Sequence, residues 1–232
     1  MKTIGILGGM SAASTQIYYR LLCQLTQEHL GGLHSPELLI RSLDFDRIEK
    51  LQAADHWWEA GEILNREALA LERGGADFII LATNTMHKLS GQMMNGLSIP
   101  FIHIAEATAH SITEAGLVAP GLMATAFTME QDFYTGKLVE AGLTPIIPEE
   151  ADRQNTHRII YEELCKGITA KDSEAEYIAI AERLVNRGAD CLILGCTEVG
   201  MLISEANVSV PVFDTTQIHC AAALQYALET KM

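Results

Sequence analysis

Two stretches of this chain repeat one another, and the repeat constrains the fold more than any other feature. The segment GADFIILAT, from Gly75 to Thr83, matches GADCLILGC, from Gly188 to Cys196, at an offset of 113 positions (188 − 75). Two further pairs follow the same order: Ile99-Pro100-Phe101 with Val210-Pro211-Val212, and the strand–turn–helix pattern of Thr3–Tyr19 with that of Val118–Tyr134. Solenoid repeats have much shorter periods. The repeat therefore predicts two similar α/β lobes that face each other across a cleft.

The alternative is that any helix–GAD–strand unit looks alike, because glycine ends helices and aliphatic residues fill buried strands. The matched order of three elements favours duplication. Short β-branched runs alternate with longer helical stretches, which predicts two pseudo-symmetric Rossmann-like lobes with mostly parallel sheets. We expect the first lobe to hold residues 1–100 plus 213–232, and the second to hold residues 101–212.

The same alternation predicts the individual elements. The expected strands are 3–7, 38–42, 78–82, 101–103, 118–124, 191–195 and 210–213. The expected helices include 130–141, 154–166, 173–187 and a last one from Thr215. Ser14 is expected to cap the first helix, and Asp55 to cap a helix that ends near Arg73, since both side chains can accept from backbone amides.

Composition excludes several classes of partner. The chain has 232 residues, 48% of them hydrophobic, and a formal charge of −14. Its scattered basic residues form no patch for nucleic acid or for an anionic membrane. The five cysteines are an odd number without a C-x-x-C pair, so neither a disulfide scaffold nor a zinc site is indicated. Without a recognisable signal segment or a membrane-length apolar run, a reduced cytoplasm is the expected setting.

Polar residues follow several predicted strands, where ligands bind in parallel sheets. Cys196 comes directly after one strand and before a short helical stretch, and a helix N-terminus lowers the pKa of a thiol. It could instead be a small buried hydrophobic residue, as free cysteines often are. Thr83 holds the matching place in the first repeat, and could also be a turn or cap residue.

Two other features carry weaker signals. Gly8-Gly9 follows a strand and can offer amides to an anion, but it is not a G-x-G-x-x-G motif, so a carboxylate is favoured over a nucleotide. His87, His103 and His219 lack metal-ligand spacing, which favours structural roles for all three.

Taken together, the motifs resemble the aspartate/glutamate racemase family over nearly the whole chain. They are Ile4–Ser11 with Ser14-Thr15 and Tyr18–Arg20, Gly31–Ser35, Thr83–His87, Thr128–Tyr134, Gly195–Glu198 and Pro211–Thr215. The resemblance implies two lobes with the active site between them, an amino-acid substrate, a homodimer, and no pyridoxal phosphate or metal cofactor.

The resemblance also implies a mechanism in which two groups flank the α-carbon and exchange its proton. Most members of the family use two cysteines, at the positions of Thr83 and Cys196 here. One branch has threonine at the first position, which makes Thr83 and Cys196 the expected catalytic pair. The substrate-binding residues implied in the same way are Met10, Gln52, Asn84, Thr85, Thr125, Thr128, Lys166, Thr197 and Glu198, with Arg47 as a further candidate for a second carboxylate.

Two other functions stay open at this point. The chain could be another isomerase of the superfamily, acting on maleate or a hydantoin. It could also be a binding protein for an amino acid or a dicarboxylate, in which Thr83 in place of cysteine has ended catalysis.

Overall fold

The computed structural model describes residues 1–197 and 199–229. This part of the chain divides into two compact units. The first unit comprises Met1–Ile104 and the chain from His219 onward, and the second unit comprises Ala105–Ile218. The chain therefore passes from one unit to the other after residues 104 and 218, a few residues later than the boundaries expected after residues 100 and 212. Every strand pair is parallel, as expected for this α/β class.

The first unit is built on a four-stranded sheet in the order β2-β1-β3-β4. Its strands are β1 (Ile4–Gly8), β2 (Leu38–Ser42), β3 (Phe78–Leu81) and β4 (Phe101–Ile102). Its helices are α1 (Ala12–Leu30), α2 (Phe45–Ala53), α3 (Trp57–Arg73), the 3-10 helix η1 (Thr85–Leu89), α4 (Ser90–Met93) and most of α10 (Thr215–Leu228). This order is the strand–helix alternation of a doubly wound sheet.

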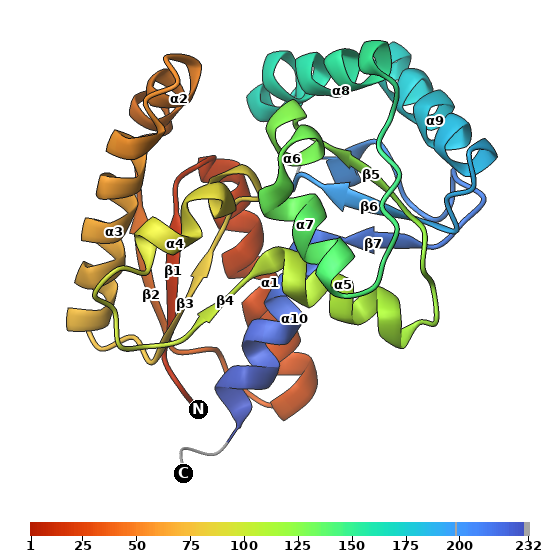
Figure 1. Ribbon diagram of the computed structural model, residues 1–232. Helices are drawn as coiled ribbons and strands as arrows, with labels where there is room; N and C mark the ends of the chain where they lie inside the picture. The colour runs from red at the N-terminus through yellow and green to blue at the C-terminus, as the bar shows by residue number, and fades with distance from the viewer. Residues whose placement is uncertain (198, 230–232) are drawn as a thin grey trace. The chain divides into compact units, whose positions relative to one another are not determined.

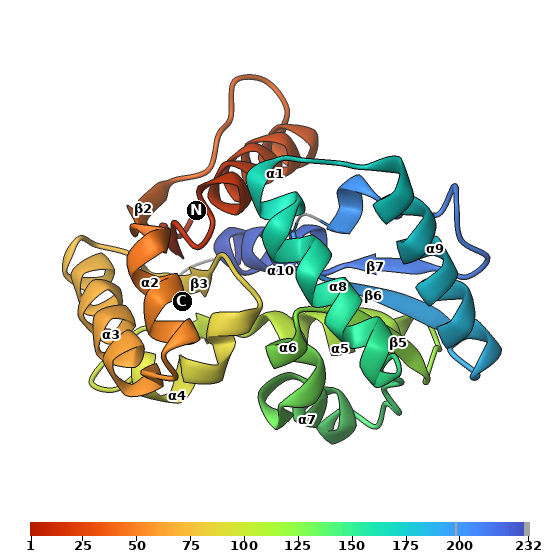
Figure 2. The ribbon, with the colours of Figure 1, turned by 90° about the horizontal axis from the view of Figure 1, so that it is seen from above.

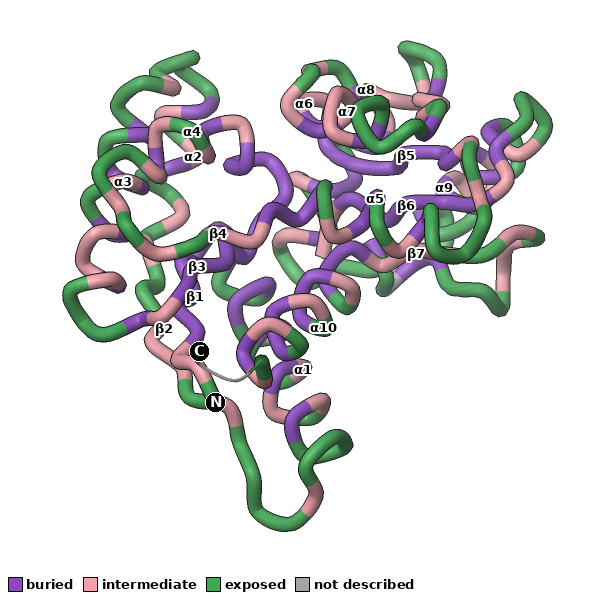
Figure 3. Tube along the Cα trace, turned by 60° about the horizontal axis from the view of Figure 1, so that its bottom comes forward, coloured by how far each residue is buried: buried purple, intermediate pink, exposed green. Residues whose placement is uncertain are grey.

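Helices cover both faces of this sheet (Figure 1). Alternate strand residues such as Leu7 and Ile79 pack with α3, while Ile6 and Ile80 pack with α1 and α10. Since successive side chains of a strand point to opposite faces, a strand buried on both sides must be apolar throughout. Figure 3 shows β1 and β3 as buried segments, whereas β2 is more open to solvent.

The second unit has a three-stranded sheet in the order β5-β6-β7. Its strands are β5 (Pro120–Ala124), β6 (Cys191–Gly195) and β7 (Val212–Asp214). Its helices are α5 (Ile104–Glu114), α6 (Ala126–Glu130), α7 (Asp132–Glu140), α8 (Glu150–Glu162), α9 (Lys171–Asn186) and the 3-10 helices η2 (Leu164–Lys166) and η3 (Val199–Met201). In Figure 2, α8 and α9 lie along this sheet, and their apolar residues share a core with Leu192 and Leu194.

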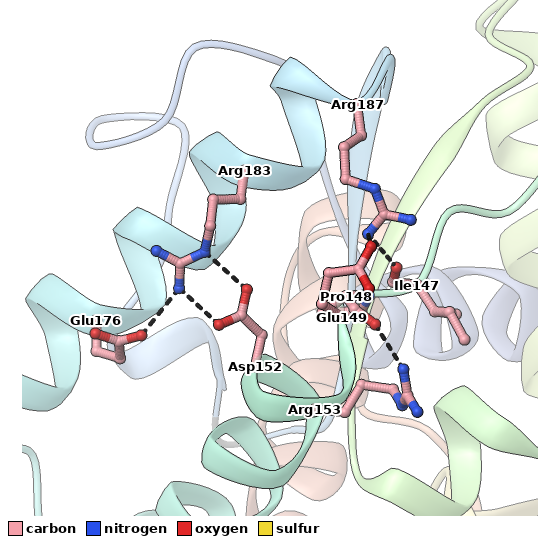
Figure 4. A network of polar contacts seen from close by, with 8 residues as sticks. All are labelled: Ile147, Pro148, Glu149, Asp152, Arg153, Glu176, Arg183 and Arg187. Carbon is pink, nitrogen blue, oxygen red and sulfur yellow. Dashed lines mark hydrogen bonds and ion pairs between the residues drawn. The ribbon is translucent and has the colours of Figure 1, made fainter.

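Ion pairs tie α8, α9 and the loop before α8 together on the surface of the second unit (Figure 4). Arg183 holds Asp152 through two hydrogen bonds of 2.7 and 2.8 Å and also reaches Glu176 at 3.0 Å. Arg187 pairs with Glu149 at 3.1 Å. Both arginine side chains are more than two-fifths exposed, so solvent screens these pairs and each adds little to stability.

The two units repeat the same backbone contacts. The strand registers match: Ile4 pairs with Phe78 as Pro120 pairs with Cys191, and Ile79 pairs with Phe101 as Leu192 pairs with Val212. Gly75 and Gly188 have positive φ angles of 100° and 101°, which only glycine adopts without strain. Asp77 accepts from the amide of Thr3, and Asp190 accepts from the amide of Ala119. Agreement at this level supports duplication over a chance likeness of sequence.

Several expected boundaries were wrong, for identifiable reasons. Ser11 caps α1, because its hydroxyl accepts from the amide of Ser14 at 3.2 Å. His56 is the N-cap residue of α3, while Asp55 has a φ of 58° and accepts from the indole of Trp57. The strand expected from residue 118 begins at Pro120, because the preceding amides bond to Asp190.

Three further differences concern element ends. The helix expected over 130–141 corresponds to α7, which begins at Asp132, after the extended residue Gln131, and ends at Glu140. The helix expected to run to Lys166 ends at Glu162, before the separate turn η2. The last strand spans Val212–Asp214, so it begins two residues later than expected. Helices α2, α4, α5 and α6 were not expected.

Gly5 lies where β1 passes close to the residue before β3. A Cβ at this position would come within 2.9 Å of the Ala76 Cβ and 3.1 Å of the Phe78 carbonyl. We expect Gly5→Ala to lower the free energy of unfolding by about 1–3 kcal/mol, the usual cost of overpacking. In the control Gly136→Ala, the new Cβ meets only Asp132 at 3.8 Å in α7. That variant should gain about 1 kcal/mol from helix propensity. Urea unfolding measures the stability of both variants, and equal changes in their free energies of unfolding would contradict this prediction.

Among the residues described, no helix is long and apolar enough to cross a membrane.

Candidate active site

Thr83 lies just past the carboxyl end of β3 and is held through its backbone. Its amide donates to the Leu81 carbonyl at 2.8 Å, and its own carbonyl lies 2.7 Å from Nδ1 of His87. The side chain is 9% exposed. Asn84 and Thr85, which begin the turn into η1, are similarly buried. The first unit therefore presents three polar residues in succession at this strand end.

Cys196 lies at the matching place in the second unit, just past the carboxyl end of β6. It is partly buried, as is Thr197. The Cys196 carbonyl accepts from the amide of Val199 at 3.1 Å. The helical stretch that follows is the three-residue 3-10 turn η3, so a long helix with a full macrodipole does not stand behind this thiol. The sequence argument for thiol activation by a helix is correspondingly weakened.

The neighbouring strand in each unit ends in a pair of hydroxyl side chains. In the first unit, Ser11 and Ser14 lie 3.2 Å apart, and in the second, Thr125 and Thr128 lie 3.1 Å apart. Ser11 and Thr125 are the N-cap residues of α1 and α6. Because Ala124 is paired with Gly195, Thr125 and Cys196 follow directly after paired positions of adjacent strands. The hydroxyl pair and the thiol thus belong to one sheet edge.

The other expected substrate-binding residues are distributed over both units. Met10 is buried after β1, and Gln52 is buried on α2, where its amide contacts the sulfur of Met86. Lys166 is exposed at the end of η2, and Arg47 is exposed on α2. Glu198 lies outside the described residues. Met10, Gln52, Thr83, Asn84 and Thr85 belong to the first unit, and Thr125, Thr128, Lys166, Cys196 and Thr197 belong to the second.

Two cysteines and a tyrosine come together in the second unit, which the sequence did not indicate. Cys165 and Cys196 both pack against the core that contains Tyr177. Burial raises the pKa of Tyr177 well above its usual value, and the charges of Cys196 and Cys165 raise it further. The Tyr177 hydroxyl donates to the Thr156 carbonyl at 3.1 Å. Only the three-dimensional fold brings these residues together.

Three histidines form a buried cluster behind the Thr83 turn. The ring of His87 lies 4.5 Å from that of His103 and 5.8 Å from that of His219. Burial holds the pKa of His87 well below its usual value. Burial also lowers the pKa of His219 from 6.5 to about 4. In the described part of the chain, no group of three or more His, Cys, Asp or Glu side chains could hold a metal ion.

The neutral His219 ring makes stability depend on pH. As pH falls through 6.5, the unfolded chain takes up a proton that folded His219 refuses until about pH 4, so acid favours unfolding. Between about pH 7 and about pH 4.5 this group should remove about 2 kcal/mol of stability. The loss of stability in acid should be smaller by that amount in His219→Gln, because glutamine does not titrate and its amide keeps a donor for the Ile102 carbonyl. Identical pH slopes in urea unfolding would contradict this.

Comparison with known proteins shows the family and the fold of this chain. The family model described as Asp/Glu/Hydantoin racemase matches residues 7–223. The chain belongs to this family. Among solved structures, it resembles a candidate Asp/Glu racemase from Yersinia pestis, with 44% identity, a TM-score of 0.93, and coverage of 99% of this chain and 100% of the other. An aspartate racemase homologue from Pyrococcus horikoshii OT3 has 35% identity and a TM-score of 0.86 over the same shares of the two chains.

A curated relative of this racemase family member is the broad specificity amino-acid racemase RacX of Bacillus subtilis (strain 168). It is 23% identical over 226 residues, which are 92% of either chain. The family fold, two α/β lobes with parallel sheets, is the one described above for this chain.

Proposed function

We propose that this family member is an amino-acid racemase that acts on aspartate, glutamate or a related amino acid without a cofactor. Racemisation removes the α-proton from one face of the carbon and returns a proton to the other face. The reaction therefore requires two proton-transfer groups, one for each face. In this proposal the groups are the thiolate of Cys196 and the hydroxyl of Thr83.

One observation carries the proposal: Thr83 and Cys196 hold equivalent positions in two duplicated units. Each residue lies just past the end of a strand that follows a GAD sequence, and the two positions differ by the repeat offset of 113 (196 − 83). Each strand keeps the same register in its own sheet. Proton transfer on both faces of the α-carbon requires two groups, and the duplication provides one such group after the equivalent strand of each unit.

The remaining polar residues fit the recognition of an amino acid. Amides and side chains near Asn84, Thr85 and Thr197 would bind the α-carboxylate. Met10, Gln52, Thr125, Thr128 and Glu198 would surround the ammonium group and the side chain. Lys166 is proposed to pair with a second carboxylate, because charge-assisted hydrogen bonds are the strong ones. Its exposed position leaves room for it to reach a bound ligand.

A direct test is to incubate the protein with each enantiomer of aspartate and glutamate, and to follow the opposite enantiomer by chiral chromatography. We expect both enantiomers of at least one amino acid to approach an equal mixture, since thermodynamics fixes that ratio. Failure of all four to racemise would contradict the proposed substrate class.

Thr83 in place of the usual cysteine favours one other candidate, a binding protein that has lost catalysis. A protein that only binds amino acids would melt at a higher temperature with its ligand, because ligand binding to the native state stabilises it. It would not convert the ligand. A rise in melting temperature together with conversion supports the racemase, and a rise without conversion supports the binding protein.

A further inference from the structure

His87 holds the turn that carries Thr83 through the backbone. Its Nδ1 lies 2.7 Å from the Thr83 carbonyl oxygen, and its Nε2 lies 3.2 Å from the amide nitrogen of Ile104. A carbonyl can only accept, so Nδ1 must carry the proton and donate it. The Ile104 amide can only donate, so Nε2 must be the acceptor. These two contacts fix one neutral tautomer, and the burial of the ring favours the neutral form.

Both ring nitrogens are therefore occupied by backbone groups. His87 cannot take a proton from the Thr83 hydroxyl while these bonds persist, which excludes it as the general base for that residue. What His87 can do is fix the orientation of the Thr83 peptide. Its attachment to the Ile104 amide links the turn after β3 to the end of β4.

A second buried histidine, His219, binds the end of β4. His219 Nε2 lies 2.9 Å from the Ile102 carbonyl, and its Nδ1 lies 2.8 Å from the Tyr18 hydroxyl. By the same reasoning Nε2 donates and Nδ1 accepts, so this tautomer is also fixed. The carbonyl before His103 and the amide after it are thus both bound by buried imidazoles. The Thr83 turn is thus connected, through His87 and the end of β4, to His219 and Tyr18.

The equivalent places in the second unit have other residue types. The repeat offset relates His87 to Gly200 (87 + 113), and the β4–β7 offset relates His103 to Asp214 (103 + 111) and His219 to Thr108 (219 − 111). The Cys196 carbonyl accepts instead from the amide of Val199. None of these three positions in the second unit is a histidine.

We propose that His87 is a positioning residue for Thr83, which it holds for proton transfer on one face of the substrate. This inference rests on the proposed racemase function. A thiolate is a competent base, whereas a hydroxyl transfers a proton only from a closely defined position. A misplacement of about 1 Å can cost about a hundredfold in rate. The hydroxyl of Thr83 therefore depends more on the position of its backbone than the thiol of Cys196 does.

Two variants test the two hydrogen bonds of the His87 ring separately. His87→Asn places an amide nitrogen near the position of Nδ1, so it keeps a donor for the Thr83 carbonyl. His87→Gln places its amide near the position of Nε2, so it keeps a partner for Ile104 and loses the bond to Thr83. Each variant is incubated in heavy water with each enantiomer, and α-deuterium is followed by NMR. Exchange on the Cys196 face reports folding and binding, and exchange on the Thr83 face reports positioning.

We expect His87→Gln to slow exchange on the Thr83 face by about a hundredfold and to leave the Cys196 face nearly unchanged, with His87→Asn close to the wild type. Equal slowing on both faces, or equal behaviour of the two variants, would overturn the role of His87 alone. Wild-type protein that exchanges neither enantiomer would overturn the proposed function as well. Long-range ¹H–¹⁵N NMR of the wild type gives a test independent of variants, because a proton on Nε2 of His87 would contradict the assignment.

Discussion

Cys196→Ala is expected to lower the rate of amino-acid racemisation by about a thousandfold, within the range for removal of a general acid–base group. The thiolate is the stronger of the two proposed bases, and no other described thiol follows a strand at this sheet edge. Loss should occur in both directions, because each direction needs the thiol either to remove or to supply the proton. Chiral chromatography measures both rates.

Cys191 provides a matched control within the same strand. It is buried in β6, and burial raises the pKa of its thiol to about 12, so it has no reactive thiolate at ordinary pH. Cys191→Ala should lower stability and leave racemisation nearly unchanged in the folded fraction. If the Cys191 variant lost as much activity as the Cys196 variant, the activity could not be assigned to Cys196.

Thr83→Ala is expected to uncouple hydrogen exchange from inversion. Racemisation should fall by about a hundredfold, since one of the two transfer groups is gone. The Cys196 face should still lose its α-proton and regain deuterium from the exchanged thiol, with the configuration kept. NMR in heavy water combined with chiral chromatography distinguishes this result from loss of the whole site, which would stop exchange on both faces.

Two substitutions at the same position control this experiment. Thr83→Ser keeps a hydroxyl and should keep measurable racemisation. Thr83→Cys restores two thiols, so the enantiomer that reacts slowly in the wild type should react faster. The wild type itself should exchange its two enantiomers at unequal rates, because a hydroxyl is a much weaker base than a thiolate. Equal wild-type rates would contradict the assignment of Thr83 and Cys196 to opposite faces.

Much of the fold could be predicted because buried parallel strands consist of continuous runs of apolar residues. The bounds of β2 and β6 were predicted correctly, and the repeat around Asp77 and Asp190 predicted the duplication. The ends of other elements depend on side chains that compete for the same amides. In the structure Ser11 caps α1, whereas the sequence predicted Ser14. The path of the turn decides between them, and local residue preferences do not describe that path.

The candidate site was predictable to a smaller extent. Thr83 and Cys196 could be found because both follow a recognisable strand within a repeat. His87, His219 and Tyr18 could not be connected, since residues 18 and 219 lie at opposite ends of the chain and meet only in the folded first unit. The proximity of Cys165 to Tyr177 arises in the same way, from the packing of η2 beside α9.

The most direct test of the central claim is α-hydrogen exchange in heavy water. Wild-type protein is incubated separately with each enantiomer of aspartate and glutamate, and deuterium at the α-carbon is followed by NMR. The account predicts exchange with both enantiomers of at least one of these amino acids, faster for the one whose proton faces Cys196, and inversion of configuration. Absence of exchange with all four, in protein that the same amino acids stabilise against heat, would contradict racemisation and identify a binding protein instead.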